Sequence, residues 1–460
     1  MLGSGLEQLI RLGRNMLLAR LLLPDVFGTV ALVLTVTSLV DSLSQIGIRE
    51  AVIQSSDAND PDFLSSALFV ALVRGAALSA VVWVGAPLAA AFYKRPDLVP
   101  MLQVASLSFF FQGAFSVKGY TALKQISTGK WVFVEQLGGV IGVVLSVVLS
   151  LWHHDAWGLV IGSTFENLAR TVLSYLVFPF KPRLHFDKTK FAAVMTYSRS
   201  LIGLPVLTFV YLQADMFAVG RMLNATQVGL YAMAAGLSRI PDMVVARFST
   251  TLVIPAYAEI QNDPQSISRS LRGVIRNTGL ITGPLCVAAV LYGDLVMSAL
   301  YSDPYRGVGL VFGLLFIAST LRNLSVPFSA ICFATARLRP LWMVSGWRAV
   351  VVLAAIYPAT RAFGMLGVAL CILVSAVVAY ILQIPALRGL VGPEGARSLG
   401  EIWRGGVFSI PVVLAYPLVR HASALGSIAG ASAAALAVVA CYVCYGLYFR
   451  YRASHKTGTS

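Results

Sequence analysis

Long apolar stretches separated by short polar connections run along the whole chain. A helix needs about 20 apolar residues to cross the hydrocarbon core of a bilayer. Fourteen stretches approach or exceed that length, at about 2–22, 26–48, 64–92, 99–120, 131–151, 157–178, 196–219, 228–251, 274–300, 308–333, 341–360, 365–387, 406–420 and 427–449. They do not alternate apolar and polar residues, as strands of membrane barrels do. The pattern predicts an all-α polytopic membrane protein with about 14 transmembrane helices.

Composition agrees with this interpretation. Of the 460 residues 57% are hydrophobic and only 12% are charged, about half the charged fraction of a soluble protein. The net charge of +15 does not indicate a nucleic-acid partner, because Lys and Arg are concentrated in connections on one side, such as 179–195 and 258–273. Cytoplasmic loops carry this excess. Both termini are therefore expected in the cytoplasm.

A stretch of the first half of the chain is repeated in the second half. With an offset of 201, residues 20–53 align without gaps to 221–254 with seven identities over 34 positions. The alignment pairs Arg20 with Arg221, Gly28 with Gly229 and Asp41 with Asp242, residue types that are scarce in membrane helices. Six helices lie between equivalent positions, so the halves share one orientation. Duplicated bundles of this kind, related by a pseudo-two-fold axis along the membrane normal, are typical of secondary transporters.

The repeat and the polar connections predict the domain organisation. Two six-helix lobes, 1–180 and 196–388, are joined by a cytoplasmic linker at 181–195. A second linker, 389–405, leads to a terminal two-helix hairpin at 406–449 and a tail at 450–460. Within the lobes, Gly138-x-x-x-Gly142, Gly158-x-x-x-Gly162 and Gly279-x-x-x-Gly283 have the spacing that lets membrane helices cross closely.

Ionisable residues inside the spans carry most of the functional information, because each is costly unless it is paired or hydrated. The first helix has Glu7, Arg11 and Arg14 on one face. The second and eighth helices carry the repeat-related Asp41 and Asp242. Further charges in or near spans are Arg74, Glu135, Glu166, Arg170, Asp215, Arg239, Arg247, Arg322 and Arg348.

Two interpretations of these charges compete. They hold helices together in ion pairs, or they line a water-filled cavity that accepts an anionic substrate. Pairing is favoured for Glu135, Glu166, Arg170 and Arg348, whereas Arg74 and Arg322 fit either. Repeat symmetry favours the cavity for the first, second, seventh and eighth helices. Arginine binds phosphate or carboxylate through two hydrogen bonds, and a carboxylate can bind a coupling cation. The candidate substrate-binding residues are therefore Arg11, Arg14, Arg239, Arg74 and Arg322. The candidate ion-coupling residues are Glu7, Asp41, Asp215 and Asp242.

Short segments that resemble motifs of soluble enzymes have simpler structural explanations. Asp60-Pro-Asp62 has the form of a glycosyltransferase DxD, but Asp before Pro is ordinary helix-start chemistry. His153-His154-Asp155 lies in a short turn without further metal ligands. The sequence has no Walker A motif. We expect no enzyme activity, no cofactor and no metal.

The opening stretch of the chain resembles a known family. Its most specific part is Leu18-Ala-Arg-Leu-Leu-Leu-Pro-Asp-Val-Phe-Gly28, preceded by Gly3-Ser-Gly-Leu-Glu-Gln-Leu-Ile-Arg-Leu-Gly-Arg14 and followed by Ile46-Gly-Ile-Arg-Glu-Ala-Val-Ile-Gln54. These segments, the hydropathy and the two-lobe layout are similar to polysaccharide-biosynthesis membrane proteins. That family includes the Wzx-like oligosaccharide flippases of the multidrug/oligosaccharidyl-lipid/polysaccharide exporter superfamily.

The resemblance implies a flippase of the bacterial inner membrane for surface polysaccharide such as exopolysaccharide, O-antigen or capsule. It would move undecaprenyl-pyrophosphate-linked oligosaccharide from the cytoplasmic to the periplasmic leaflet by alternating access, with H⁺ or Na⁺ as coupling ion and a polysaccharide polymerase as a partner. A lipid II flippase and a cation-coupled drug exporter of the same superfamily remain as alternatives. A membrane-embedded polymerase or ligase is disfavoured because no large outward loop is present.

Overall fold

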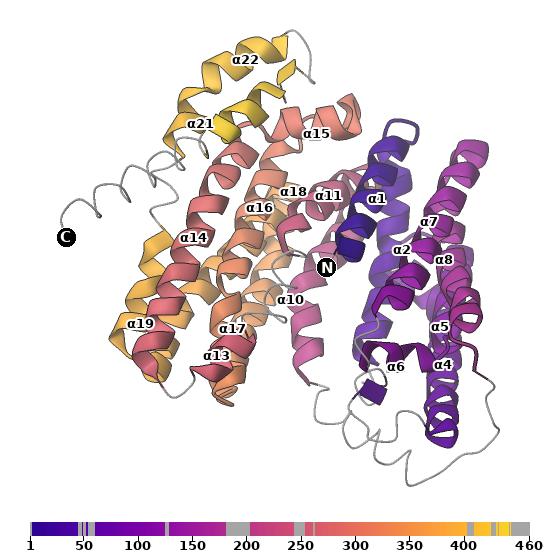
Figure 1. Ribbon diagram of the computed structural model, residues 1–460. Coiled ribbons are helices and arrows are strands. Elements are labelled where there is room, and N and C mark those ends of the chain that lie inside the picture. The colour runs from indigo at the N-terminus through magenta and orange to yellow at the C-terminus, as the bar shows by residue number, and fades with distance from the viewer. Residues whose placement is uncertain are drawn as a thin grey trace. The chain divides into compact units, whose positions relative to one another are not determined.

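The computed structural model describes residues 2–44, 48, 52–53, 60–124, 128–180, 203–242, 254–260, 263–402, 409–424, 429–430, 432–440 and 442. The chain divides into two compact units, Met1–Gly229 and Leu230–Ser460, and each is described by itself (Figure 1). The described residues form helices and turns and contain no strand. The predicted lobe and linker boundaries are a finer division, and they stay a prediction.

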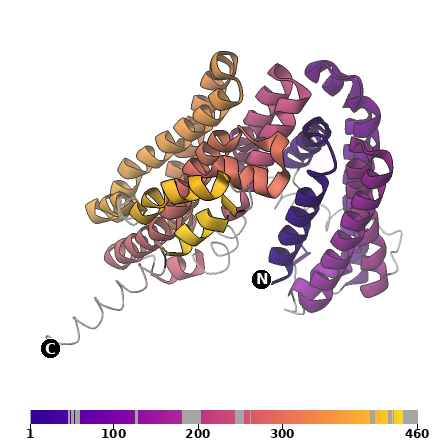
Figure 2. The same cartoon turned by 90° about the horizontal axis from the view of Figure 1, so that it is seen from above.

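The first unit is built from α1 (Leu2–Leu18), α2 (Pro24–Leu43), α4 (Pro61–Tyr93), α5 (Leu98–Gly113), α6 (Lys118–Lys124), α7 (Thr128–His153), α8 (Ala156–Val177) and α10 (Gly203–Met222). Helix α8 packs against α7, α5 and α2, while α4 packs against α5 and α10 packs against α2. Figure 2 shows these helices from above, in indigo, purple and magenta.

Helix α11 (Ala225–Ser238) spans the boundary between the units. The second unit continues with α13 (Ile254–Glu259), α14 (Pro264–Leu291), α15 (Gly293–Tyr301), η2 (Asp303–Tyr305), α16 (Gly309–Leu324), α17 (Val326–Ala334), α18 (Arg339–Val391), α19 (Pro393–Ser398), η3 (Leu399–Ile402), α21 (Ile410–Leu414) and α22 (Tyr416–Ala424). Helix α16 packs against both α14 and α18.

Among the described residues, six helices are long and apolar enough to cross a membrane. This establishes a polytopic helical membrane protein, and the count of fourteen spans stays a prediction. Some predicted spans are interrupted. The span at 99–120 consists of α5 and the short α6, because the chain leaves the helix after Gly113 and re-enters it at Lys118. The span at 274–300 is similarly divided between α14 and α15.

Helix starts follow local capping chemistry. The Asp60 side chain accepts a hydrogen bond from the backbone N–H of Asp62 at 3.1 Å, so the DxD sequence begins α4 as expected. Asp155 caps α8 by accepting from the backbone N–H of Trp157 at 3.0 Å. At the start of α14, hydrogen bonds from the side chain and backbone of Ser266 hold the pKa of Asp263 below its usual value. Side-chain acceptors satisfy backbone donors that a helix leaves free at its first turn.

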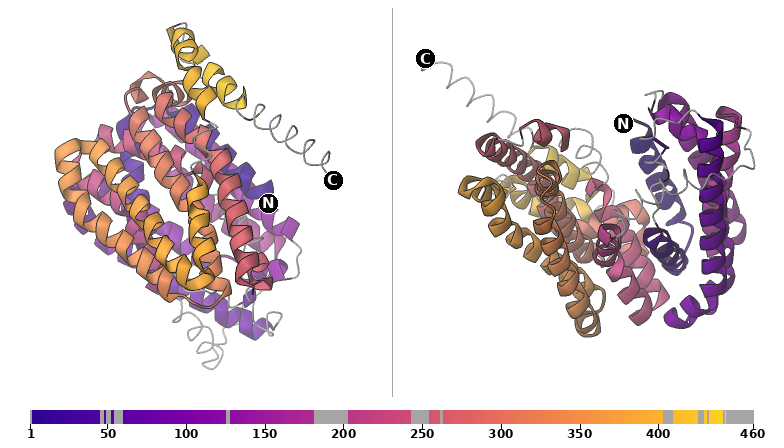
Figure 3. Two further views of the ribbon diagram at one scale, coloured as in Figure 1. Left: turned by 90° about the vertical axis from the view of Figure 1, so that its left-hand side faces the viewer. Right: turned by 90° about the horizontal axis from the view of Figure 1, so that it is seen from below.

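Helix α18 contains two predicted spans, 341–360 and 365–387, in one 53-residue element. Gly364 separates them with φ 58° and ψ −135°, a backbone conformation that residues with a Cβ rarely adopt. The chain turns back there, and the Sγ of Cys371 lies 3.8 Å from the carbonyl oxygen of Val352. Figure 3 (left) shows the two orange halves side by side.

Glycine determines how closely α7 and α8 cross. The two predicted glycine motifs lie on facing surfaces of this pair. A Cβ on Gly142 of α7 would lie 2.5 Å from the Cβ of Glu166, and a Cβ on Gly162 of α8 would lie 2.8 Å from the Cα of Ser146. Small residues let membrane helices approach without a hydrophobic driving force. For the third motif, the structure shows Gly279 buried in α14.

The repeat-related glycines also meet each other. A Cβ on Gly28 of α2 would lie 2.3 Å from the carbonyl oxygen of Ala225 and 2.9 Å from the backbone nitrogen of Gly229. The close approach explains why both positions of the repeat hold glycine: neither backbone leaves room for a side chain.

We predict that Gly162→Ala destabilises the protein by about 1–3 kcal/mol, the usual cost of forcing an extra carbon into a packed contact. The measurement is the thermal midpoint of purified protein in detergent. Gly85→Ala is the control, because a Cβ there meets nothing within 4 Å and alanine is the better helix former. Equal midpoints for the two variants would contradict the close crossing.

Candidate functional site

An ion pair joins α2 to α4 in the first unit. Arg74 Nη2 lies 2.8 Å from Asp41 Oδ1. The same guanidinium donates from Nε to the carbonyl oxygen of Ser44 at 2.9 Å and from Nη2 to the Ser44 hydroxyl at 3.1 Å. Asp41 is a predicted ion-coupling residue and Arg74 a predicted substrate-binding residue, so the structure brings one member of each set together.

A second pair of the same kind lies in the second unit. Arg322 Nη2, on α16, is 2.6 Å from Asp242 Oδ2, and the Ser319 hydroxyl donates to Asp242 Oδ1. The Arg322 side chain is 13% exposed and that of Asp242 is 26% exposed. Both carboxylate oxygens of Asp242 are thus engaged. Its charge is neutralised within the unit.

The two aspartates are related by the repeat, but their partners are not. Arg74 lies on α4, which carries the span next after that of Asp41. Arg322 lies on α16, and α14 intervenes between Asp242 and α16 in the sequence. The chain therefore preserves the ion pair across the duplication while the arginine has moved to a different helix.

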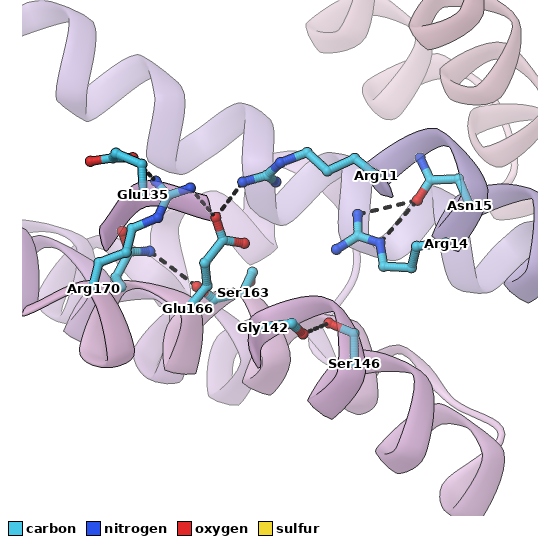
Figure 4. Close-up of polar contacts among 10 residues, drawn as sticks. Arg11, Arg14, Asn15, Glu135, Gly142, Ser146, Ser163, Glu166 and Arg170 are labelled. Carbon is cyan, nitrogen blue, oxygen red and sulfur yellow. Dashed lines mark hydrogen bonds and ion pairs between the residues drawn. The ribbon is translucent and has the colours of Figure 1, made fainter. Parts of the chain in front are cut away.

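A four-residue network connects α1 to α7 and α8 (Figure 4). Arg11 donates to Glu166, whose side chain is only 5% exposed. Glu166 also lies 2.8 Å from Arg170 Nη2, one turn away on α8, and Arg170 Nη1 lies 3.1 Å from Glu135 on α7. Two arginines and two glutamates give no net charge. The pairing interpretation is confirmed for Glu135, Glu166 and Arg170, and Arg11 is part of the same network.

The other predicted residues have different surroundings. The Arg14 guanidinium donates to Asn15 Oδ1 at 3.1 and 3.2 Å. Asp215, on α10, is 2% exposed and accepts from the backbone N–H of Met216 at 2.8 Å. Arg239 directly follows α11 and is half-buried. Glu7 belongs to α1, but its side chain lies outside the described part of the structure.

A half-open groove of about 180 Å³ lies within the first unit between α2, α5 and α8. These helices contribute Val30, Val33, Leu34, Thr37, Ser38, Asp41, Ala105, Ser108, Phe109, Gln112, Val160, Ser163 and Asn167. On α2 and α8 the apolar lining residues precede the polar ones in the sequence, and on α5 the last lining residue is Gln112. Asp41, at the polar end, is shared with the Arg74 ion pair.

The groove and the hydroxyl partners of the ion pairs lie outside the set of residues predicted from the sequence. Ser44, Ser319, Gln112 and Asn167 are uncharged, and the predicted set holds charged residues alone. A signal was present: Ser108 and Gln112 are four residues apart, as are Ser163 and Asn167, and such pairs form a polar stripe on one face of an otherwise apolar helix. The packing of the helices determines which polar stripes face each other, and the sequence alone does not show it.

The fold is that of known membrane transporters. The chain is similar to the lipid II flippase MurJ in an inward closed conformation, with a TM-score of 0.74, 11% identity and coverage of 96% of this chain and 98% of that structure. It is also similar to an inward-facing multidrug resistance MATE family transporter, with a TM-score of 0.63, 15% identity and coverage of 84% and 95%. At these identities the likeness concerns the fold alone.

The model of the polysaccharide biosynthesis protein family matches residues 17–308, more than half of the chain, and the chain belongs to this family. A relative is the lipopolysaccharide biosynthesis protein WzxC of Escherichia coli, 21% identical over 421 residues that cover 91% of this chain and 84% of WzxC. Another is the succinoglycan biosynthesis transport protein ExoT of Rhizobium meliloti, 23% identical over 65% of this chain and 60% of ExoT. The predicted family is confirmed.

We predict that Asp242→Ala costs about 3 kcal/mol of stability, because removing one partner of a buried pair leaves the other charge uncompensated. Adding Arg322→Met should restore part of that loss. Asp303→Ala serves as control, since its pair with Arg306 is exposed and such pairs contribute little. The measurement is the thermal midpoint of each purified variant. A double variant no more stable than Asp242→Ala would contradict the pairing.

Proposed function

We propose that this protein is a flippase that moves an undecaprenyl-pyrophosphate-linked oligosaccharide from the cytoplasmic to the periplasmic leaflet of the bacterial inner membrane, for surface polysaccharide synthesis. The observation that carries the proposal is the pair of arginine–aspartate contacts at Asp41 and Asp242, the repeat-related positions. Family membership and the transporter fold support it.

The ion pairs suggest how an anionic substrate and a coupling cation exchange partners. A guanidinium bound to a carboxylate presents the same donor geometry that a phosphate would accept. When a coupling cation occupies Asp41 or Asp242, it competes with Arg74 or Arg322 and releases that arginine for the pyrophosphate. Substrate and ion binding then favour each other. The same reasoning applies to Arg11, which Glu166 holds in the resting network.

Arg14 and Arg239 complete the set of proposed anion-binding residues, and Glu7 and Asp215 complete the proposed cation-binding set. Alternating access between the predicted lobes would carry the bound lipid headgroup across the membrane. Both termini lie in the cytoplasm in this proposal, as the distribution of Lys and Arg predicts. The coupling ion is H⁺ or Na⁺, and a polysaccharide polymerase is the expected partner on the periplasmic side. The names of the relatives favour a polysaccharide precursor over lipid II or a drug as cargo.

We predict that Arg11→Ala, Arg14→Ala and Arg239→Ala each lower surface polysaccharide at least tenfold in a flippase-null strain, because each removes a guanidinium from the pyrophosphate. The measurement is complementation by the variant gene at matched membrane expression. Arg306→Ala is the control, since Arg306 is 57% exposed and, among the described residues, pairs only with Asp303. Full complementation by all three variants would refute the assignment.

We further predict that Asp41→Asn and Asp242→Asn abolish ion-driven accumulation. An amide keeps the size of the side chain but removes the charge that a coupling cation needs. In proteoliposomes with an imposed proton or sodium gradient, the variants should equilibrate a lipid-linked oligosaccharide without concentrating it. Wild-type accumulation by both variants under the same gradient would exclude these residues from coupling.

A further inference from the structure

We propose that the polar end of the groove between α2, α5 and α8 is a subsite for one sugar ring, the first sugar attached to the lipid pyrophosphate. This inference rests on the proposed function and adds to it the part of the substrate that the first unit recognises.

Size limits the ligand to a single ring. The groove of about 180 Å³ is smaller than the pockets that take drug-sized ligands. Its polar end extends along α2 from Thr37 to Asp41, four residues or about 6 Å of helix. A pyranose ring has this length, and a disaccharide exceeds it.

Chemistry points to a polyhydroxyl ligand. The polar end presents the hydroxyls of Ser38, Ser108 and Ser163 and the amides of Gln112 and Asn167. Among the described residues, the side chains of Ser38, Ser108 and Gln112 have no hydrogen-bond partner. Hydroxyl and amide groups both donate and accept, which suits sugar hydroxyls, and unpaired polar groups at membrane depth are costly without a ligand or water.

Charge favours a neutral ligand for the hydroxyl and amide groups of the groove. Among the described lining residues Asp41 alone carries a carboxylate, and Arg74 lies 2.8 Å from it. In the proposed cycle Asp41 exchanges Arg74 for the coupling cation, so its charge is neutralised in both states. The remaining polar groups are neutral and suit an uncharged sugar ring.

Position relates the groove to the phosphates. Asp41 belongs both to the lining and to the ion pair, so the Arg74 guanidinium lies beside the polar end. A pyrophosphate released onto Arg74 would place the sugar that is bonded to it next to the groove. The order of groups in the structure, guanidinium and then hydroxyl-lined groove, is the order of groups in the ligand, pyrophosphate and then sugar.

The test compares the binding of four probes to the full-length protein in nanodiscs: undecaprenyl pyrophosphate alone and the same lipid carrying glucose, galactose or N-acetylglucosamine. We expect at least one glycosylated probe to bind wild type about fivefold or more tightly than the bare lipid, the value of one net hydrogen bond. Gln112→Leu and Asn167→Leu should remove this difference and leave the affinity for the bare lipid unchanged, which also shows that the variants are folded.

Gln103→Leu is the matched control. Gln103 lies on the same helix nine residues earlier, half a turn away from the Gln112 face, and does not line the groove. It should keep the wild-type difference.

Three outcomes would overturn the subsite. Wild type binds no glycosylated probe more tightly than the bare lipid; the difference survives both groove variants; or the groove variants change the sodium dependence of binding and keep the sugar difference, which identifies a cation site. Binding of the bare lipid tests the proposed function separately. If wild type binds none of the four probes, both proposals fail, whereas binding of the bare lipid without any sugar difference rejects only the subsite.

Discussion

The constraint on which this structure depends is the cost of a charge inside a membrane protein, which most of the described charges lower by pairing with one another. In the described spans, Arg74 meets Asp41, Arg322 meets Asp242, and Arg11 and Arg170 meet Glu166 and Glu135. Each contact joins residues from different helices, so neutralisation also fixes which helices are neighbours. A guanidinium that leaves its carboxylate needs another anion. A ligand that binds the arginine or the aspartate of a pair therefore leaves the other residue in need of a new counter-ion. The same ion pairs can therefore hold helices together and take part in substrate binding.

Close backbone contact is the second requirement, since lipid offers no hydrophobic force that would press helices together. Many large apolar side chains are exposed, and a few, such as Trp152 and Leu176, are more than 70% exposed, which suits a lipid surrounding. Packing is instead achieved where side chains are absent. Gly142 and Gly162 bring α7 and α8 close enough for Arg170 on α8 to reach Glu135 on α7. The glycine surface and the ion network therefore depend on each other.

The two halves of the chain have retained different features of the duplicated sequence. The aspartate is retained at both related positions, and so is the glycine that precedes it by thirteen residues. The arginine that pairs with the aspartate comes from α4 in one unit and from α16 in the other. The polar groove beside Asp41 belongs to the first unit. In the proposed cycle both ion pairs exchange partners with the pyrophosphate and the coupling cation, and the groove beside Asp41 adds sugar recognition in the first unit.

The sequence by itself determined the class of fold, the family and the scarce residues worth examining, because apolar length, repeated Asp and Gly positions and a conspicuous local segment are properties of the chain that need no packing. It also determined the helix start at Asp60, where the capping group is two residues from its donor. Only the tertiary structure decided that Arg74 and Arg322 are the partners of Asp41 and Asp242, that α5 ends at Gly113, and that Ser108, Gln112 and Asn167 share one groove. Those facts depend on which helix faces meet, between residues that are 33, 80 or more positions apart in the sequence. Helical periodicity shows which residues share a face of one helix, but it does not show which other helix packs against that face.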